Sequence, residues 1–163
     1  MIVNCYEDLI DYDSGKEYLI VEKEGKVQSV QVGSESRVVV NKIDLKNATR
    51  IIHNHPIDLP PSPQDVYTFL SERNINESCV ITPDKRYVCL KRTKLTPPPI
   101  IVGSRSAFQR SYNHIGRIIL YKKGFTSSKE APNQKDLQNE VLEEFSRKNH
   151  IELIRGGCKV KNK

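Results

Sequence analysis

Two histidines in the middle of the chain have the spacing of metal ligands. His53 and His55 are two residues apart in the run RIIHNHP, where Ile51 and Ile52 predict a strand that ends at Pro56. Alternate residues of a strand point to the same face of a sheet, so both imidazoles are expected on one side. Zinc takes nitrogen ligands in this way, and the spacing therefore predicts part of a zinc site.

A carboxylate ten residues after the second histidine could complete the ligand set. Ser62 suits the N-cap of a helix, Pro63 its first position, and Asp65 falls in its first turn. The proline-rich loop before Ser62 would let the chain fold back and bring Asp65 to the metal. Two histidines and one carboxylate leave a fourth position open, as in catalytic zinc sites. The same serine and aspartate are also simply a favourable helix start, and the two roles are compatible.

A hydrolytic zinc site also needs a carboxylate that accepts a proton from water and passes one to the leaving amine. Glu17 heads the predicted strand EYLIVEK and could lie beside the metal. Glu22, Glu24 and Glu35 compete, but Glu22 is at the far end of the strand, Glu24 in a predicted turn and Glu35 in a loop. Ser62 is predicted to donate a hydrogen bond to the developing oxyanion.

The pattern H-N-H-P…S-x-x-D, with an upstream glutamate at the start of a strand, resembles the JAMM (MPN-plus, JAB-type) zinc metallopeptidases. HNHP itself looks like the RadC branch of that superfamily. Six residues separate His55 from Ser62, one fewer than is usual, which resembles the small JAB-type domains of phage head-morphogenesis proteins. The resemblance covers residues 14–92.

This resemblance implies an α/β fold, with a mixed β-sheet flanked by helices in the MPN/JAB-like and cytidine-deaminase-like layering. It implies hydrolysis of a peptide or isopeptide bond in a protein or peptide substrate, such as a ubiquitin-like tail or a phage structural protein. Carried over by position, it gives Glu17 as general base, Ser62 as oxyanion partner, and a Zn²⁺ ion held by His53, His55 and Asp65.

Further elements are predicted from hydrophobic periodicity and turn residues. The predicted strands are a hairpin over 17–32 turning at Glu24-Gly25, and the segments 36–40, 78–82, 86–90 and 151–154. The predicted helices are 65–73, 104–124 with an interruption at Gly116, and 133–149, and three prolines at 97–99 predict a stiff extended connector.

The 163 residues suit one domain by length, yet charge divides the chain in two. Residues 1–93 carry 12 Lys and Arg against 14 Asp and Glu, whereas residues 94–163 carry 14 against 6. We predict a JAB/MPN-like catalytic core over 1–93 and a basic, mainly helical extension over 94–163, packed on the core or following it. The extension either contacts nucleic acid or an acidic partner, or is a solvated helical face with a basic tail.

Cysteine usage predicts no disulfide framework. The four cysteines form no C-x-x-C pair, and Cys79 and Cys89 lie in apolar, strand-like runs where they are expected as small buried hydrophobic residues. A four-cysteine zinc site stays open. No apolar run approaches the roughly 20 residues of a membrane-spanning helix. The N-terminal residues lack the features of a secretion signal, so a cytoplasmic protein is predicted.

Other polar residues near the motif are assigned structural roles. Asn54 is expected on the opposite face of the strand, bonded to the local backbone. Asp58 is a loop residue, and His114 and His150 are expected on the surface. The letters HNH do not indicate an HNH nuclease, because that motif is spread over a much longer ββα unit. Three functions follow: a zinc-dependent protease or isopeptidase, a metal-containing MPN-like binding module without turnover, and nucleic-acid contact through the basic segment.

Overall fold

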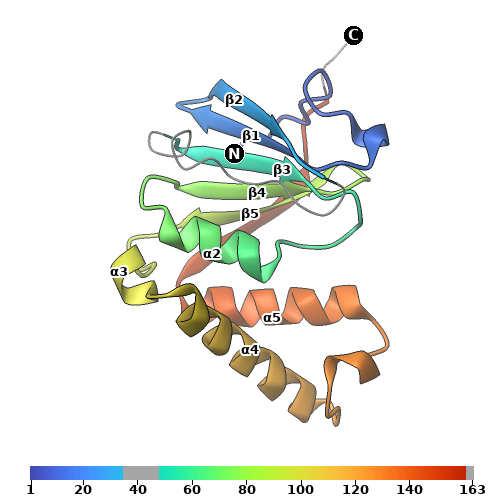
Figure 1. Ribbon diagram of the computed structural model, residues 1–163, viewed down its shortest axis with the longest axis vertical. Helices are drawn as coiled ribbons and strands as arrows, with labels where there is room; N and C mark the ends of the chain where they lie inside the picture. The colour runs from blue at the N-terminus through green and yellow to red at the C-terminus, as the bar shows by residue number, and fades with distance from the viewer. Residues whose placement is uncertain (35–47, 161–163) are drawn as a thin grey trace.

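A six-stranded mixed sheet is the centre of the fold (Figure 1). The structure is a computed structural model that describes residues 1–34 and 48–160. In the sheet the strands follow the order β2-β1-β3-β4-β5-β6. Their bounds are β1 (Tyr18–Lys23), β2 (Lys26–Val32), β3 (Arg50–Asn54), β4 (Glu77–Ile81), β5 (Arg86–Arg92) and β6 (Ile151–Gly157). The helices are α2 (Pro63–Ser71), α3 (Pro99–Val102), α4 (Arg105–Lys122) and α5 (Gln134–Lys148), with 3-10 turns η1 (Tyr12–Ser14) and η2 (Ser128–Glu130). The general α/β class is confirmed.

The pairing of the strands follows from their connections. The hairpin β1–β2 turns at Glu24 and Gly25, which both have positive φ, the geometry of tight turns between twisted strands. This hairpin is confirmed, whereas the strand expected over 36–40 lies outside the described residues. β3 and β4 are parallel, because α2 crosses over between them, and the other neighbours are antiparallel.

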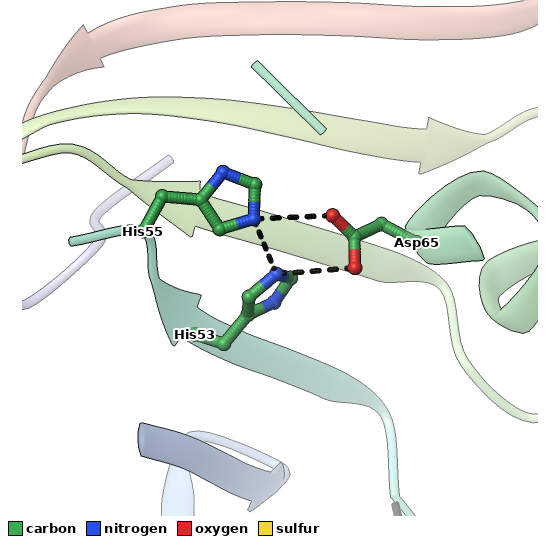
Figure 2. Close-up of side chains that lie close together, drawn as sticks. All are labelled: His53, His55 and Asp65. Atoms are coloured by element: carbon green, nitrogen blue, oxygen red, sulfur yellow. Dashed lines mark hydrogen bonds and ion pairs between the residues drawn. The ribbon is translucent and has the colours of Figure 1, made fainter. Parts of the chain in front are cut away.

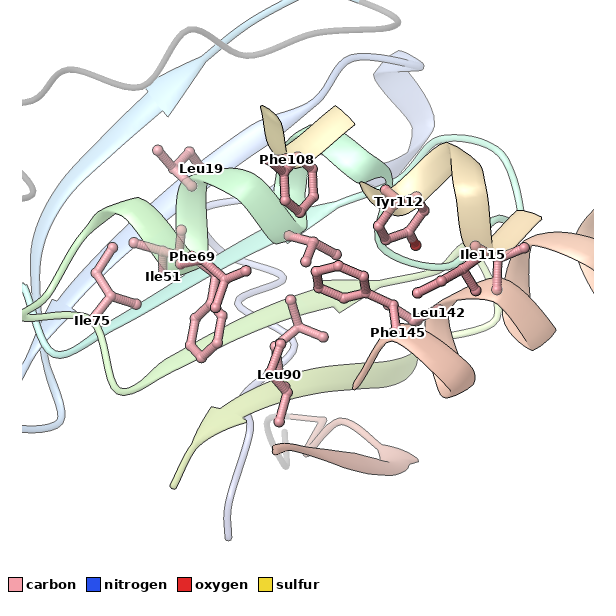
Figure 3. Close-up of a cluster of buried hydrophobic side chains, with 14 of the residues drawn as sticks. Leu19, Ile51, Phe69, Ile75, Leu90, Phe108, Tyr112, Ile115, Leu142 and Phe145 are labelled. Atoms are coloured by element: carbon pink, nitrogen blue, oxygen red, sulfur yellow. The ribbon is translucent and has the colours of Figure 1, made fainter. Parts of the chain in front are cut away.

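Both faces of the sheet are covered at its centre, so β1 and β3 are buried along nearly their whole length. Helices α2, α4 and α5 lie on one face, and the apolar side chains of that face form a large cluster with them (Figure 3). Leu19 and Ile51 belong to this cluster. Their neighbours Ile20 and Ile52 point to the other face, where they pack against the N-terminal segment that includes Val3.

The C-terminal segment completes the sheet. β6 pairs antiparallel with β5, and α4 and α5 contribute to the cluster on the helical face, so segments 1–93 and 94–163 share one sheet and one core. The predicted break at Gly116 is wrong, since α4 is continuous through it. Glycine costs a helix only about 1 kcal/mol relative to alanine, and the buried face of this long helix offsets that. The proline connector ends at Pro99, which is the first residue of the short helix α3.

The prediction of no disulfide framework is also wrong. Cys79 and Cys89 are directly opposite one another on β4 and β5 and form a disulfide. Cys5 and Cys158 form a second, between the N-terminal segment and the residue after β6. Their sequence spacing gives no sign of either pair, because strand register and the meeting of the two terminal segments bring them together. Among the described residues, no helix has the length and apolar character needed to cross a membrane.

Candidate metal centre

The two histidines lie at the carboxyl end of β3. His53 is within the strand, and His55 follows it while still donating from its backbone N–H to the carbonyl of Ile81 on β4, at 2.8 Å. Both side chains are therefore on the helical face of the sheet, like Ile51. Their Nε2 atoms lie 3.0 Å apart (Figure 2), as the i, i+2 spacing predicts.

Asp65 approaches both imidazoles from the first turn of α2. Its Oδ1 lies 3.2 Å from Nε2 of His53 and its Oδ2 lies 3.2 Å from Nε2 of His55. The same carboxylate accepts a hydrogen bond from the backbone N–H of Ser62 at 2.8 Å, and the Ser62 hydroxyl accepts one from the backbone N–H of Asp65 at 3.2 Å. This capping box fixes the carboxylate, so the helix start and the histidine contact use one side chain at once.

The proton arrangement of His55 favours a cation at this point. Its Nδ1 lies 2.9 Å from the carbonyl oxygen of Leu59, and because a carbonyl can only accept, Nδ1 carries the proton. In the neutral ring, Nε2 then presents a lone pair toward the carboxylate of Asp65 and Nε2 of His53. A positive ion between the three groups would turn these facing lone pairs into ligands. The bond to Leu59 also sets the ring orientation, as in protein metal sites.

The spacing of the three groups fits zinc. Metal–ligand distances near 2.0–2.1 Å with tetrahedral angles place two ligand atoms about 3.3 Å apart. The separations here are 3.0 Å between the two Nε2 atoms and 3.2 Å from each Nε2 to an Asp65 oxygen. Among the described residues, His53, His55 and Asp65 are also the one group of three or more such side chains close enough to hold a metal ion.

The charges of His53 and Asp65 shift each other's pKa in opposite directions. Burial lowers the pKa of His53, but the charge and hydrogen bond of Asp65, with a smaller contribution from Glu17, outweigh it, and the pKa is raised. For Asp65 burial raises the pKa, but the two histidines hold it well below its ordinary value. Asp65 is therefore a carboxylate at neutral pH, which is the form that binds metal.

Glu17 lies next to this group. It directly precedes β1, and Leu19 pairs with His53 across β1 and β3, so extending that register by two residues puts Glu17 opposite His55 on the same face. Its backbone continues the β1–β2 ladder through a bond to Ser34 and one from Gly33, each 2.8 Å long. In keeping with this register, its charge contributes to the raised pKa of His53.

Asn54 has a role that was not predicted. It faces away from the histidines, as expected, but it does not bond to its local backbone. Its Oδ1 accepts from the N–H of Tyr18 at 2.6 Å and its Nδ2 donates to the carbonyl of Lys16 at 3.0 Å. One buried amide thus holds the backbone on both sides of Glu17. The signal in the sequence is a polar residue in a strand that is otherwise buried, since such a residue needs hydrogen-bond partners.

The remaining candidates lie away from the group or have other partners. Glu22 is buried at the far end of β1 with Arg50, and Glu24 is exposed in the hairpin turn, whereas Glu35 is outside the described residues. Asp58 forms an ion pair with Lys135. His114 and His150 are exposed, as predicted. All four cysteines are in disulfides, which leaves no thiolate for a four-cysteine zinc site.

No protein-family model, no curated protein and no solved structure matches this chain.

Proposed function

We propose that the protein is a zinc-dependent metallopeptidase of the JAMM type, which hydrolyses a peptide or isopeptide bond in a protein substrate. The observation that carries this proposal is the convergence of two strand-borne imidazoles and one helix-borne carboxylate, at separations that suit ligands of one tetrahedral ion. A mixed sheet with helices on the side of the site is consistent with the MPN/JAB layering.

The residues divide the work between binding and proton transfer. His53, His55 and Asp65 would hold the zinc. When bound, zinc acts as a Lewis acid and lowers the pKa of a water ligand toward about 7, so that hydroxide is available at neutral pH. Glu17 accepts the proton of the attacking water and delivers a proton to the leaving amine. Asn54 positions Glu17 through the backbone on either side of it.

Ser62 is suited to the charge that develops on the substrate carbonyl. Its oxygen already accepts a hydrogen bond from the backbone N–H of Asp65, so its own hydroxyl proton can be donated to the oxyanion. The helix cap sets the position of the hydroxyl, and the proposed role adds one more hydrogen bond to it.

The first test is metal content followed by one substitution. The purified protein should bind one zinc per chain by elemental analysis. Glu17→Gln should keep that zinc and lower the hydrolysis rate by about 10²–10⁴-fold, because it removes a general base. Glu24→Gln, an exposed change at the other end of β1, should have neither effect. Activity can be followed with ubiquitin-like fusions and a peptide library.

The outcomes separate the candidate functions. A chain that binds no zinc, or a Glu17→Gln variant with unchanged turnover, contradicts the proposal. Stoichiometric zinc without cleavage of any fusion or peptide would indicate the MPN-like binding module instead.

A further inference from the structure

A pocket of about 470 Å³ lies beside the metal centre, between the start of α2, helices α4 and α5, and the segment before α5. Its volume is within the range of ligand-binding pockets. Its lining residues that matter here are Pro61, Tyr112, Asn113, Gly116, Arg117 and Gln138.

The pocket and the metal centre share a wall. Pro61 and Pro63 line the pocket, and they flank Ser62, whose backbone and hydroxyl are bonded to Asp65. Tyr112 lines the pocket from α4. The pKa of its hydroxyl is raised by burial first and then by the charge of Asp65. A chain bound in the pocket would therefore run within a few residues of the metal centre.

Arg117 gives the pocket a cation. Among the described residues it is the only charged one in the lining, and it has no ion pair with any of them. The sequence explains this, because residues 85–129 contain no Asp or Glu and helix α4 therefore brings no carboxylate to pair with it. Glu140 of α5 is already paired with Lys123 at 2.9 Å.

The rest of the lining suits a peptide. Leu120, Leu137 and Val141 supply apolar surface. Asn113 and Gln138 supply amides, and Asn113 uses only its Oδ1, which accepts from Gln109, so its N–H groups remain available to a ligand. Apolar surface, amide groups and one guanidinium are complementary to a peptide segment that carries an acidic side chain, because arginine binds a carboxylate through two parallel hydrogen bonds.

We infer that this pocket is an exosite that binds an acidic residue of the substrate chain near the bond to be cut. The inference rests on the proposed function, since it supplies the substrate class for that site: proteins with a Glu or Asp flanked by apolar residues close to the scissile bond. Nucleic acid fits less well, because the pocket combines its single cation with apolar side chains rather than with further cations.

Binding can be measured without hydrolysis. The Glu17→Gln protein, with zinc supplied in the buffer, is titrated with the blocked tripeptide amide leucyl-glutamyl-leucine and with its glutamine counterpart, and binding is followed by amide NMR shifts. The glutamate peptide should shift the signals of Gly116 and Gln138 and bind about tenfold more tightly than the glutamine peptide, as a charged hydrogen bond allows. Arg117→Gln should remove this preference. Arg110→Gln, an exposed change on the same helix, should preserve it.

A second variant tests the pocket without touching its charge. A Cβ added at Gly116 would lie 3.8 Å from Cγ2 of Val141, an ordinary contact, so α4 accepts a side chain at this position, and that of Gly116→Leu should enter the pocket and block both peptides. Equal affinity for the two peptides, shifts that map elsewhere, or a preference that survives Arg117→Gln would overturn the inference. So would a single-stranded oligonucleotide that shifts the same signals at lower concentration than the peptide.

The two proposals can fail separately. If zinc-dependent cleavage is found but the peptides do not bind at Arg117, only the exosite is wrong. If the peptides bind as expected but the protein holds no zinc, the metallopeptidase is wrong and a peptide-binding pocket remains. Where both hold, Arg117→Gln should raise KM for an acidic substrate about tenfold and leave kcat unchanged.

Discussion

The strands β1 and β3 carry a polar cluster at each end, and the two clusters differ in how their charges are satisfied. At one end Glu22 pairs with Arg50, directly across the strands, on the face covered by the N-terminal segment. At the other end His53, His55 and Asp65 meet on the helical face. Both groups are largely buried and both centre on a carboxylate.

The Glu22 cluster is complete within the protein. Its Oε2 accepts from Nε of Arg50 at 2.6 Å, and its Oε1 accepts from Nη2 of Arg50 at 3.1 Å and from the hydroxyl of Tyr6. Arg50 also donates to the carbonyl of Ile2 at 2.9 Å and lies 3.6 Å from Glu77. Every charge therefore faces a donor or a charge of opposite sign, which is the pattern of a structural ion pair.

The cluster around Asp65, by contrast, could hold a cation from outside the protein. Nδ1 of His55 donates to the carbonyl of Leu59, so its Nε2 is the ring nitrogen that faces the carboxylate of Asp65. The two clusters are alike in burial but differ in their partners, because the carboxylate of Glu22 meets a permanently charged guanidinium whereas that of Asp65 meets two imidazoles. One locks the N-terminal segment to the sheet, and the other could hold a metal ion.

The largest expected effect is a loss of stability when the Glu22 cluster is broken. Glu22→Ala leaves the guanidinium of Arg50 without its main partner, and breaking a buried pair in this way costs about 3 kcal/mol or more. Chemical denaturation should show this loss, while zinc content stays at the wild-type level. The exposed Glu24→Ala is the control and should change the free energy of unfolding little. Loss of zinc in Glu22→Ala would mean that the two clusters are coupled.

The converse experiment changes the cluster around Asp65. Asp65→Asn keeps an oxygen that can accept from the backbone of Ser62, so the helix cap should persist, but the charge that binds metal is lost. Zinc affinity, measured by calorimetry, should fall by more than the roughly 100-fold caused by losing a residue behind the ligands. Asp58→Asn, in the loop between the two histidines and α2, should retain affinity. Unchanged zinc binding in Asp65→Asn would remove the ligand assignment.

The difference between the clusters also marks what the sequence can predict. The metal centre is local: His53 and His55 share a strand face by parity, and Asp65 follows on the next helix, so spacing alone predicts which side chains meet. The Glu22–Arg50 pair could not be predicted, because it depends on the register between β1 and β3, whose intervening chain contains another predicted strand.

The same reasoning applies to the fold. Periodicity and turn residues indicated the hairpin, α2, β4, β5 and α5, each of which is formed by local residues. The disulfides could not be predicted, since Cys5 and Cys158 meet only because the N-terminal segment lies beside the end of β6. Asn54 was placed on the correct face by its parity, but its partners Lys16 and Tyr18 again depend on the register of β1.

A smaller effect is expected at Asn54, which bonds the backbone on both sides of Glu17. Asn54→Ala should keep zinc but release the backbone around Glu17, and we expect kcat to fall about tenfold with KM unchanged, because a misplaced base acts less well. Asn54→Asp is the matched variant: it can still accept from Tyr18 but cannot donate to Lys16, so its kcat should be intermediate. A change confined to stability, with kcat at the wild-type value, would make Asn54 purely structural.

The smallest effect is expected at Tyr6, because Glu22 also accepts two hydrogen bonds from Arg50. Tyr6→Phe leaves both bonds from Arg50 to Glu22 in place, so the free energy of unfolding at pH 7 should fall by only about 1 kcal/mol, the value of one hydrogen bond, with zinc content unchanged.

Burial first, and then the hydrogen bond to Glu22, raise the pKa of Tyr6 to about 12. Because this pKa is above that of an unfolded tyrosine, about 10, the contribution of Tyr6 is complete below pH 10 and is lost as the pH rises toward 12. Denaturation curves across that interval should therefore show a shallower alkaline loss of stability in Tyr6→Phe than in the wild type, whereas Tyr121→Phe, at a side chain that is 83% exposed, should follow the wild type. A Tyr6→Phe loss as large as that of Glu22→Ala would show that the cluster depends on the tyrosine and is not complete without it.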